Sequence, residues 1–306
     1  MIKRKEKQYN ELISKAREYI SQNNIIEALK VYEEAFEINV LPDDLVDAGF
    51  LYLENKNYSE AYDAFAIVEK ALPKHSRAKY ALGLWYEEKD DIDKAIFYLE
   101  KAIELDNTCS EYLFDLGRLY DQKGLDMLAM LKYIDAINYG KDPFWACLNL
   151  GSLYERNNML DLALKYCLQA YKIDPSKKMI AYNLGVIYYR LGNLEEALKY
   201  YLKETEKPDR YNLVFYNLGV LYKDKKDYET AKYYYLQCIK NDKDNFNCWY
   251  NLACCYALLH NFSETTNCLF YAVTKNEILK TSILTDIDLT EYIKSNEYLE
   301  LIKKIS

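Results

Sequence analysis

Residues that break helices are scarce in this sequence. Nine glycines and five prolines occur among 306 residues, well below the roughly twelve per cent that these two residues make up in average proteins. An all-β fold needs glycine and proline at its tight turns, so their scarcity argues against one. The phosphate-binding loops GxGxxG and GxxxxGKS/T are also absent, which excludes the common nucleotide-binding α/β folds. The sequence therefore predicts a helical protein.

Side chains suited to metal binding or catalysis are few. The two histidines, His75 and His260, are far apart in the sequence, and no CxxC pair or zinc-like spacing of cysteine and histidine occurs,. No arrangement of serine, histidine and aspartate stands out from the many charged residues expected on helix faces,. We therefore expect no catalytic site, no metal and no cofactor, and we expect that the protein is not an enzyme.

The charge balance is acidic, with 40 lysines and arginines against 48 aspartates and glutamates and a net charge of −8. Non-specific binding to nucleic acid or anionic lipid needs a basic face, so neither partner is expected. The longest uncharged run, Asn245 to Ser263, holds several asparagines and is too polar for membrane insertion,. No apolar segment typical of a signal peptide follows Met1,. We expect a cytoplasmic protein whose eight cysteines stay free thiols in a reducing compartment.

A 34-residue repeat runs through most of the sequence. Six glycines follow one another at this interval, and an alanine occupies the seventh place in the series. A tyrosine stands three residues after each of these seven positions. A small residue comes twelve residues after each, and in most units a large apolar or aromatic residue comes sixteen after. Such spacings place residues on one face of a helix, so each unit predicts a pair of helices. The glycine series is Gly49, Gly83, Gly117, Gly151, Gly185 and Gly219, followed by Ala253, and the tyrosines are Tyr52, Tyr86, Tyr120, Tyr154, Tyr188, Tyr222 and Tyr256.

The unit pattern L-G-x-x-Y…A-x-x-x-F/Y/L resembles that of the tetratricopeptide repeat (TPR) family. With the glycine as position 8, units start near residues 42, 76, 110, 144, 178, 212 and 246, and a weaker first unit starts near residue 9. The resemblance implies an all-α, right-handed superhelical solenoid of about eight helix-turn-helix repeats. Residues 1–8 are then an N-terminal basic tail, 9–279 the repeat array and 280–306 a C-terminal capping helix.

The resemblance also implies where a ligand binds, because positions 2, 5, 6, 9, 12 and 13 line the concave surface of stacked TPRs. Position 6 is asparagine in the last four units, and an asparagine amide can bind both the C=O and the N–H of a peptide backbone. This resembles the asparagine ladder in the TPR superhelix of O-linked N-acetylglucosamine transferase. The alternative is that asparagine here is a structural residue of the repeat. The four residues are Asn149, Asn183, Asn217 and Asn251.

Tyr182, Tyr216 and Tyr250 stand one residue before three of these asparagines. Tyrosine offers a broad apolar face with a hydroxyl group, which suits a recognition surface. Packing between repeats is the alternative, as is a codon bias behind the 33 tyrosines. Two arginines at position 13, Arg156 and Arg190, would receive an acidic segment of the ligand.

These observations predict a non-catalytic scaffold that binds an extended peptide, or a segment of a partner protein, in a concave groove. A second hypothesis is a self-assembling structural or accessory subunit of a larger complex, for example of a glycosyltransferase or a secretion system. Homo-oligomerisation through tyrosine-rich surfaces belongs to this second hypothesis. The sequence names no partner.

Overall fold

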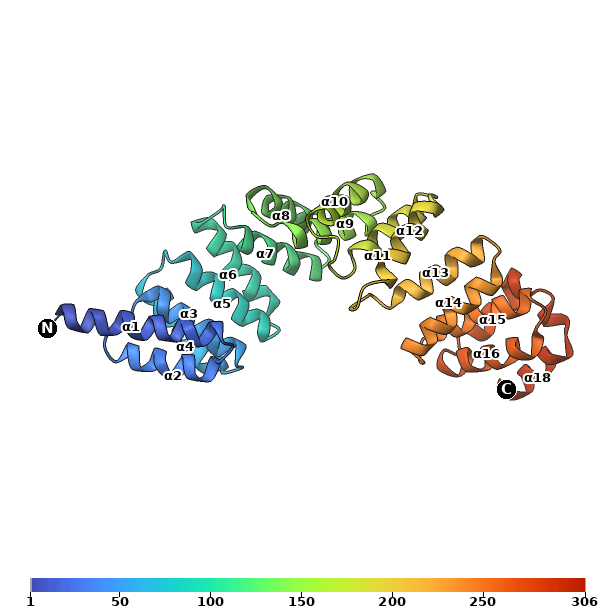
Figure 1. Cartoon of the computed structure of the whole chain (residues 1–306), viewed down its shortest axis with the longest axis horizontal. Helices are drawn as coiled ribbons and strands as arrows, with labels where there is room; N and C mark the ends of the chain where they lie inside the picture. The colour runs from blue at the N-terminus through green and yellow to red at the C-terminus, as the bar shows by residue number, and fades with distance from the viewer. Residues whose placement is uncertain (1, 306) are drawn as a thin grey trace. The chain divides into compact units, whose positions relative to one another are not determined.

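The computed structural model describes residues 2–305, and within this range it contains helices and no strand (Figure 1). Two short 3₁₀ helices, η1 (Ile287–Leu289) and η2 (Tyr292–Lys294), lie near the C-terminus. The α-helices are α1 (Ile2–Ser21), α2 (Ile25–Phe36), α3 (Pro42–Glu54), α4 (Tyr58–Ala71), α5 (Ser76–Glu88), α6 (Ile92–Leu105), α7 (Ser110–Gln122), α8 (Asp126–Tyr139), α9 (Phe144–Arg156), α10 (Leu160–Ile173), α11 (Ile180–Arg190), α12 (Leu194–Thr205), α13 (Leu213–Asp224), α14 (Tyr228–Asn241), α15 (Phe246–Leu258), α16 (Phe262–Lys275), α17 (Leu279–Thr285) and α18 (Asn296–Ile305).

The chain divides into two compact units, Met1–Leu153 and Tyr154–Ser306. In the first unit, four antiparallel hairpins follow one another from α1 to α8, and α9 begins. The second unit contains the end of α9, then α10, and then three hairpins formed by α11 to α16. The prediction of an all-α repeat protein is confirmed, and α3, α5, α7, α9 and α15 begin at the residues where their repeats start.

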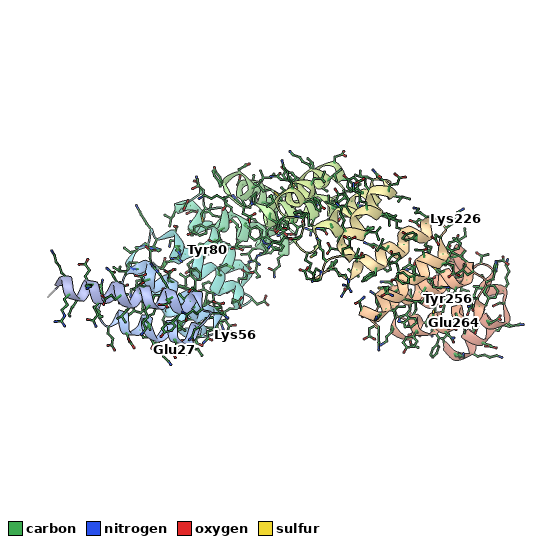
Figure 2. All side chains as sticks on the ribbon, viewed as in Figure 1. Glu27, Lys56, Tyr80, Lys226, Tyr256 and Glu264 are labelled. Atoms are coloured by element: carbon green, nitrogen blue, oxygen red, sulfur yellow. A yellow bond between two sulfur atoms is a disulfide. The ribbon has the colours of Figure 1, made fainter. Side chains whose placement is uncertain are left out.

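Every hairpin makes the same turn between its two helices. Position 15 has a left-handed backbone in all eight repeats, with φ between 58° and 76°. The next N–H donates back to the carbonyl of the position 11 tyrosine, as from Asp91 to Tyr86 at 2.9 Å, which is a common way to end a helix. Glycine serves this position in two repeats only, while residues such as Lys56 and Lys226 take it elsewhere (Figure 2). The same turn therefore forms in repeats whose position 15 residue has a Cβ atom, although a Cβ atom makes a left-handed backbone less favourable.

The two helices of a hairpin cross where glycine faces a large side chain. A Cβ atom added to Gly49 would lie 2.3 Å from the Phe65 ring, and one added to Gly219 would lie 2.5 Å from the Tyr235 ring. Phe65 and Tyr235 are both completely buried. At these crossings the absence of a side chain at position 8 allows the helices to approach closely, and the residue at position 24 fills the space,.

Many of the tyrosines are part of this packing. Position 11 tyrosine stacks on a tyrosine at position 23 of the same hairpin in four repeats, with ring centroids 5.3 to 5.6 Å apart. Such offset stacking is favourable for aromatic rings. A large part of the tyrosine excess thus serves the repeat itself. The stacked pairs are Tyr86–Tyr98, Tyr154–Tyr166, Tyr188–Tyr200 and Tyr222–Tyr234.

Both ends of the chain differ from the expected organisation. The segment expected as a basic tail is helical from Ile2, within α1, because its lysines, arginine and glutamate are good helix formers. The expected single capping helix is divided into α17, η1, η2 and α18. Leu289, Tyr292 and Leu301 of this segment are completely buried, and α18 packs against α16. Residues 1 and 306 lie outside the described part of the chain.

Cys238 and Cys248 form a disulfide, with their Cα atoms 6.5 Å apart. The expectation of eight free thiols is therefore wrong for this pair. The two residues belong to neighbouring repeats, at position 27 on α14 and position 3 on α15. Positions within single repeats do not reveal that these two side chains meet where the repeats stack.

We expect three classes of cysteine reactivity at pH 8. Burial raises the pKa of Cys147 to about 11 and that of Cys255 and Cys268 to about 12, so almost none of these groups is thiolate, the reactive form. Cys109 is half-buried and should react first with a chromogenic thiol reagent. Unfolding should release five more thiols, and reduction the last two. Eight reactive thiols after unfolding without reductant would contradict the disulfide.

Candidate functional site

The candidate asparagines lie on the first helix of their repeats and are half-buried. Asn149 is on α9 in the first unit, while Asn183, Asn217 and Asn251 are on α11, α13 and α15 in the second unit. Each of the three helices of the second unit contacts the next in the series. The second unit therefore presents one asparagine on each of three neighbouring helices.

Asn149, Asn217 and Asn251 interact with tyrosine side chains of neighbouring helices. Nδ2 of Asn251 donates to the hydroxyl of Tyr216 at 3.4 Å and to the carbonyl of Asn247 at 3.0 Å. Burial raises the pKa of Tyr182, and a hydrogen bond with Asn217 works in the opposite direction. In the first unit, Nδ2 of Asn149 donates to the hydroxyl of Tyr133 at 3.4 Å. The amides thus contribute to packing as well as to the surface.

One arrangement recurs at a spacing of 35 residues. A tyrosine at position 5 binds the asparagine or aspartate at position 6 of the next repeat, and we call this a tyrosine–Asx pair. The repeat pattern does not reveal this pair when each position is considered by itself. Tyrosine followed 35 residues later by asparagine or aspartate is the signal that reveals it. The pairs are Tyr80–Asp115 at 2.7 Å and Tyr216–Asn251 at 3.4 Å, and Tyr182 stands in the same relation to Asn217, which lowers the pKa that burial raises.

Tyr250 continues the series but binds the C-terminal segment. Its hydroxyl donates to Oδ2 of Asp286 at 2.9 Å, and Asp286 also accepts the backbone N–H of Asp288 at 2.9 Å. The turn at η1 thereby takes the place of a further repeat against α15. The hydroxyl of Tyr250 is therefore used within the chain.

The two candidate arginines lie in the second unit. Arg190 binds both the backbone carbonyl and the carboxylate of Glu155, and it donates to Oδ1 of Asn158 at 2.8 Å. An acidic ligand would have to displace this ion pair. Arg156 is exposed at the end of α9.

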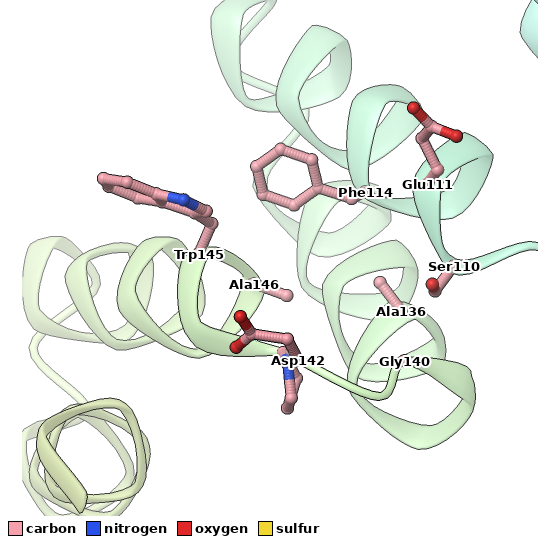
Figure 3. Close-up of a pocket in the computed structure, with 9 residues that line it drawn as sticks. Ser110, Glu111, Phe114, Ala136, Gly140, Asp142, Trp145 and Ala146 are labelled. Atoms are coloured by element: carbon pink, nitrogen blue, oxygen red, sulfur yellow. The ribbon is translucent and has the colours of Figure 1, made fainter. Parts of the chain in front are cut away.

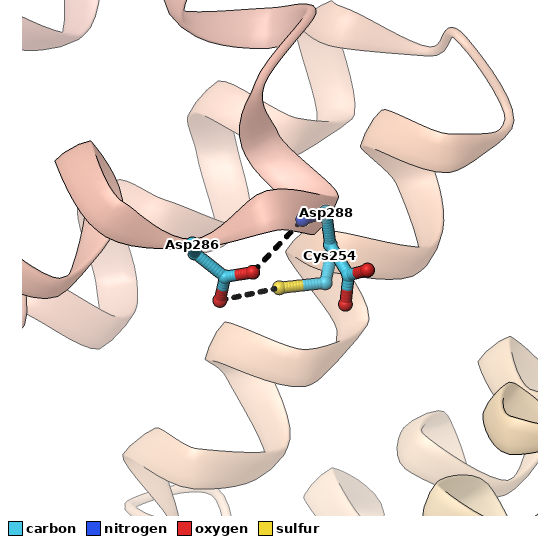
Figure 4. A group of neighbouring side chains, drawn as sticks. All are labelled: Cys254, Asp286 and Asp288. Carbon is cyan, nitrogen blue, oxygen red and sulfur yellow. Dashed lines mark hydrogen bonds between the residues drawn. The ribbon is translucent and has the colours of Figure 1, made fainter.

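Cys254, Asp286 and Asp288 bring three ligand-type atoms within 4.8 Å of one another (Figure 4). Nζ of Lys223 already lies 2.7 Å from Asp288. Burial, followed by the charge of Asp286, raises the pKa of the Cys254 thiol well above its ordinary value. A thiol that resists ionisation beside a bound ammonium group is a poor metal ligand. The group instead fastens the C-terminal turn to α13 and α15.

Comparisons with known proteins agree with this architecture. Family models described as tetratricopeptide repeat match residues 76–109, 148–211, 214–245 and 234–265. A search of curated proteins finds no match. Among residues 2–305, no helix combines the length and the apolar character that crossing a membrane would require.

Several solved structures have a similar fold. The structure of pilF from Pseudomonas aeruginosa is 17% identical, with a TM-score of 0.61 over 68% of this chain and 94% of that one. A chain of the APC/C hetero-tetramer Cut9-Hcn1 is 17% identical, with a TM-score of 0.59 over 92% of this chain and 54% of that one. YrrB, described as a TPR protein with an unusual peptide-binding site, is 22% identical, with a TM-score of 0.55 over 61% of this chain and 97% of that one.

The stacked hairpins define an all-α helical-repeat solenoid. The chain belongs to the tetratricopeptide repeat family. This fold generally serves as a scaffold for protein–protein interaction.

Proposed function

We propose that the second unit binds an extended peptide segment of a partner protein along α11, α13 and α15. The observation that carries the proposal is the series of half-buried asparagines, one on each of these helices, at Asn183, Asn217 and Asn251. Successive amides suit main-chain groups that recur along an extended peptide. Arg156 lies in the same unit at the end of α9, and Tyr182 and Tyr216 precede Asn183 and Asn217 in the sequence. The chain would act as a non-catalytic scaffold.

The tyrosine–Asx pairs support this function by orienting the amides before a peptide arrives. The bond from Nδ2 of Asn251 to Tyr216 holds the amide plane, and Oδ1 of Asn251 remains an acceptor for a peptide N–H. An amide that is already held loses less side-chain freedom on binding. Packing between repeats and ligand binding are therefore compatible uses of the same asparagine.

Selection of random peptides on the full chain provides ligands without a known partner. For a selected peptide, Asn217→Ala combined with Asn251→Ala should weaken binding about tenfold, since each net hydrogen bond contributes about 0.5–1.5 kcal/mol. Fluorescence anisotropy of the labelled peptide measures this loss. Tyr216→Phe should have a smaller effect, because it frees the Asn251 amide without removing it.

Asn241→Ala is the matched control, because Asn241 is exposed on α14 and its amide donates to the carbonyl of Gln237 within its own helix at 2.7 Å. It should leave peptide affinity unchanged. Thermal unfolding followed by circular dichroism checks that each variant is folded. Failure to select any peptide, or equal affinity of the double variant and the parent chain, would refute the proposed function.

A further inference from the structure

A pocket of about 220 Å³ lies in the first unit, between α7 and the start of α9. Figure 3 shows Glu111 and Phe114 on α7, with Asp142, Trp145 and Ala146 from the other side. Glu111 and Trp145 occupy position 2 of their repeats, and Phe114 occupies position 5. These are positions that TPR arrays expose on the concave face. The resemblance to TPR arrays therefore places the pocket at positions where a ligand is expected to bind.

Two carboxylates at this pocket have no ion pair among residues 2–305. Oδ1 of Asp142 accepts the backbone N–H of Phe144 at 3.4 Å. Glu111 lies near the hydroxyl of Tyr80 and contributes to raising the pKa of that group, after burial and Asp115. The pocket thus carries unbalanced negative charge.

Several other acidic residues of the first unit are paired with arginine. Asp47 lies 2.5 Å from Arg77, and Arg118 pairs with both Glu87 and Asp115. Lys141 is exposed in the linker before α9 but does not line the pocket. The pocket thus brings two carboxylates, Glu111 and Asp142, to one place without a basic residue in its lining.

Two aromatic residues, Trp145 and Phe114, also line the pocket. Trp145 is 50% exposed, although its ring contacts Phe144 edge-on at a centroid distance of 5.0 Å. Phe114 is half-buried on the opposite helix. An aromatic face attracts a cation, and nearby carboxylates strengthen this attraction. An apolar occupant would instead remove water from the carboxylates without replacing it.

We propose that this pocket binds the cationic side chain of a peptide, an arginine in particular. The proposal rests on the proposed peptide-binding function and adds a charge preference located in the first unit. A volume of 220 Å³ holds about seven water molecules at liquid density, which matches the size of an arginine side chain. The planar guanidinium group stacks on an aromatic ring and donates to carboxylates at its edge.

The test uses Nα-acetyl-L-argininamide as the probe and its citrulline analogue as the neutral control. NMR follows the indole N–H of Trp145, assigned among the three tryptophans with Trp145→Phe. The arginine probe should shift this signal saturably, and added salt should weaken its binding. Glu111→Gln combined with Asp142→Asn should weaken it about fivefold. Asparagine at 142 keeps an acceptor for the helix start.

Glu54→Gln combined with Glu88→Gln, two exposed carboxylates outside the pocket, serves as the control and should leave binding unchanged. Equal shifts with the citrulline probe, or no response of Trp145 to the arginine probe, would overturn the inference. Asn217→Ala combined with Asn251→Ala lies in the other unit and should leave the titration unchanged. The probe experiment can therefore fail while peptide selection succeeds, and the probe can also bind when no peptide is selected. The two proposals are thus tested separately.

Discussion

Replacing Glu204 with alanine is expected to lower the free energy of unfolding by about 3 kcal/mol. The side chain is completely buried, and its Oε1 accepts the backbone N–H groups of Met179 at 3.1 Å and Tyr211 at 3.0 Å. Lys207 lies 2.9 Å from Oε2 and is the ion-pair partner among residues 2–305. Alanine would leave two amide groups without their acceptor and would remove the ion pair of Lys207, which keeps only its hydrogen bond to the carbonyl of Lys177 among these contacts,.

Alanine is an informative replacement for Glu204 because most other repeats have alanine at the same position. Glu204 is at position 27, which is alanine in most repeats, for example at Ala170 and Ala272. In this repeat the connecting segments on both sides are irregular, and α11 and α13 begin at Ile180 and Leu213. The carboxylate replaces contacts that regular helix starts provide elsewhere. The loss on substitution therefore measures how much this single side chain holds the two segments.

Denaturant unfolding followed by circular dichroism measures the loss. Glu204→Gln should be less destabilising than alanine, because its carbonyl oxygen can still accept an N–H. Glu206→Gln is the matched control, since Glu206 is exposed two residues away. An unchanged midpoint for Glu204→Ala would show that Met179 and Tyr211 find other partners at no cost.

Replacing Gly185 with alanine is expected to destabilise the protein by about 2 kcal/mol, the usual size of an overpacking effect. The added Cβ would lie 2.4 Å from two atoms of the Tyr201 ring, and Tyr201 is only 2% exposed. The ring can move only if the two helices separate. The better helix propensity of alanine offsets part of this loss.

A second substitution should restore stability in this variant. Tyr201→Leu in the Gly185→Ala background recreates the combination that the last repeat already has at Ala253 and Leu269. A double-mutant cycle from thermal unfolding should show favourable coupling of about 1 kcal/mol or more. Additive losses from the two substitutions would contradict the proposed clash.

Much of the fold could be predicted from the period of the sequence. The glycines at position 8 mark where helices cross, and they do so because each faces a large side chain such as Tyr201 or Phe65. The sequence indicates a left-handed backbone at position 15 only in the two repeats that have glycine there. Lys56 and His260 adopt the same backbone, because the surrounding hydrogen bonds impose it whatever the residue.

Contacts between repeats were harder to predict. The Cys238–Cys248 disulfide and the tyrosine–Asx pairs join positions that differ from one repeat to the next, so reading each position separately does not find them. The binding of Arg190 to Glu155 is also invisible in the pattern of either repeat. The candidate asparagines were placed on the correct helices, while their tyrosine partners came only from the structure.

Each tyrosine–Asx pair closes a loop of only 35 residues, as from Tyr80 to Asp115. Loops of this length cost little more entropy than much shorter ones, and local contacts favour fast folding. A hairpin emerging from the ribosome therefore finds its partner in the repeat made just before it, and packing can proceed from the N-terminus as synthesis continues. The turn at Asp286 then binds Tyr250 of the last repeat once this segment has been synthesised.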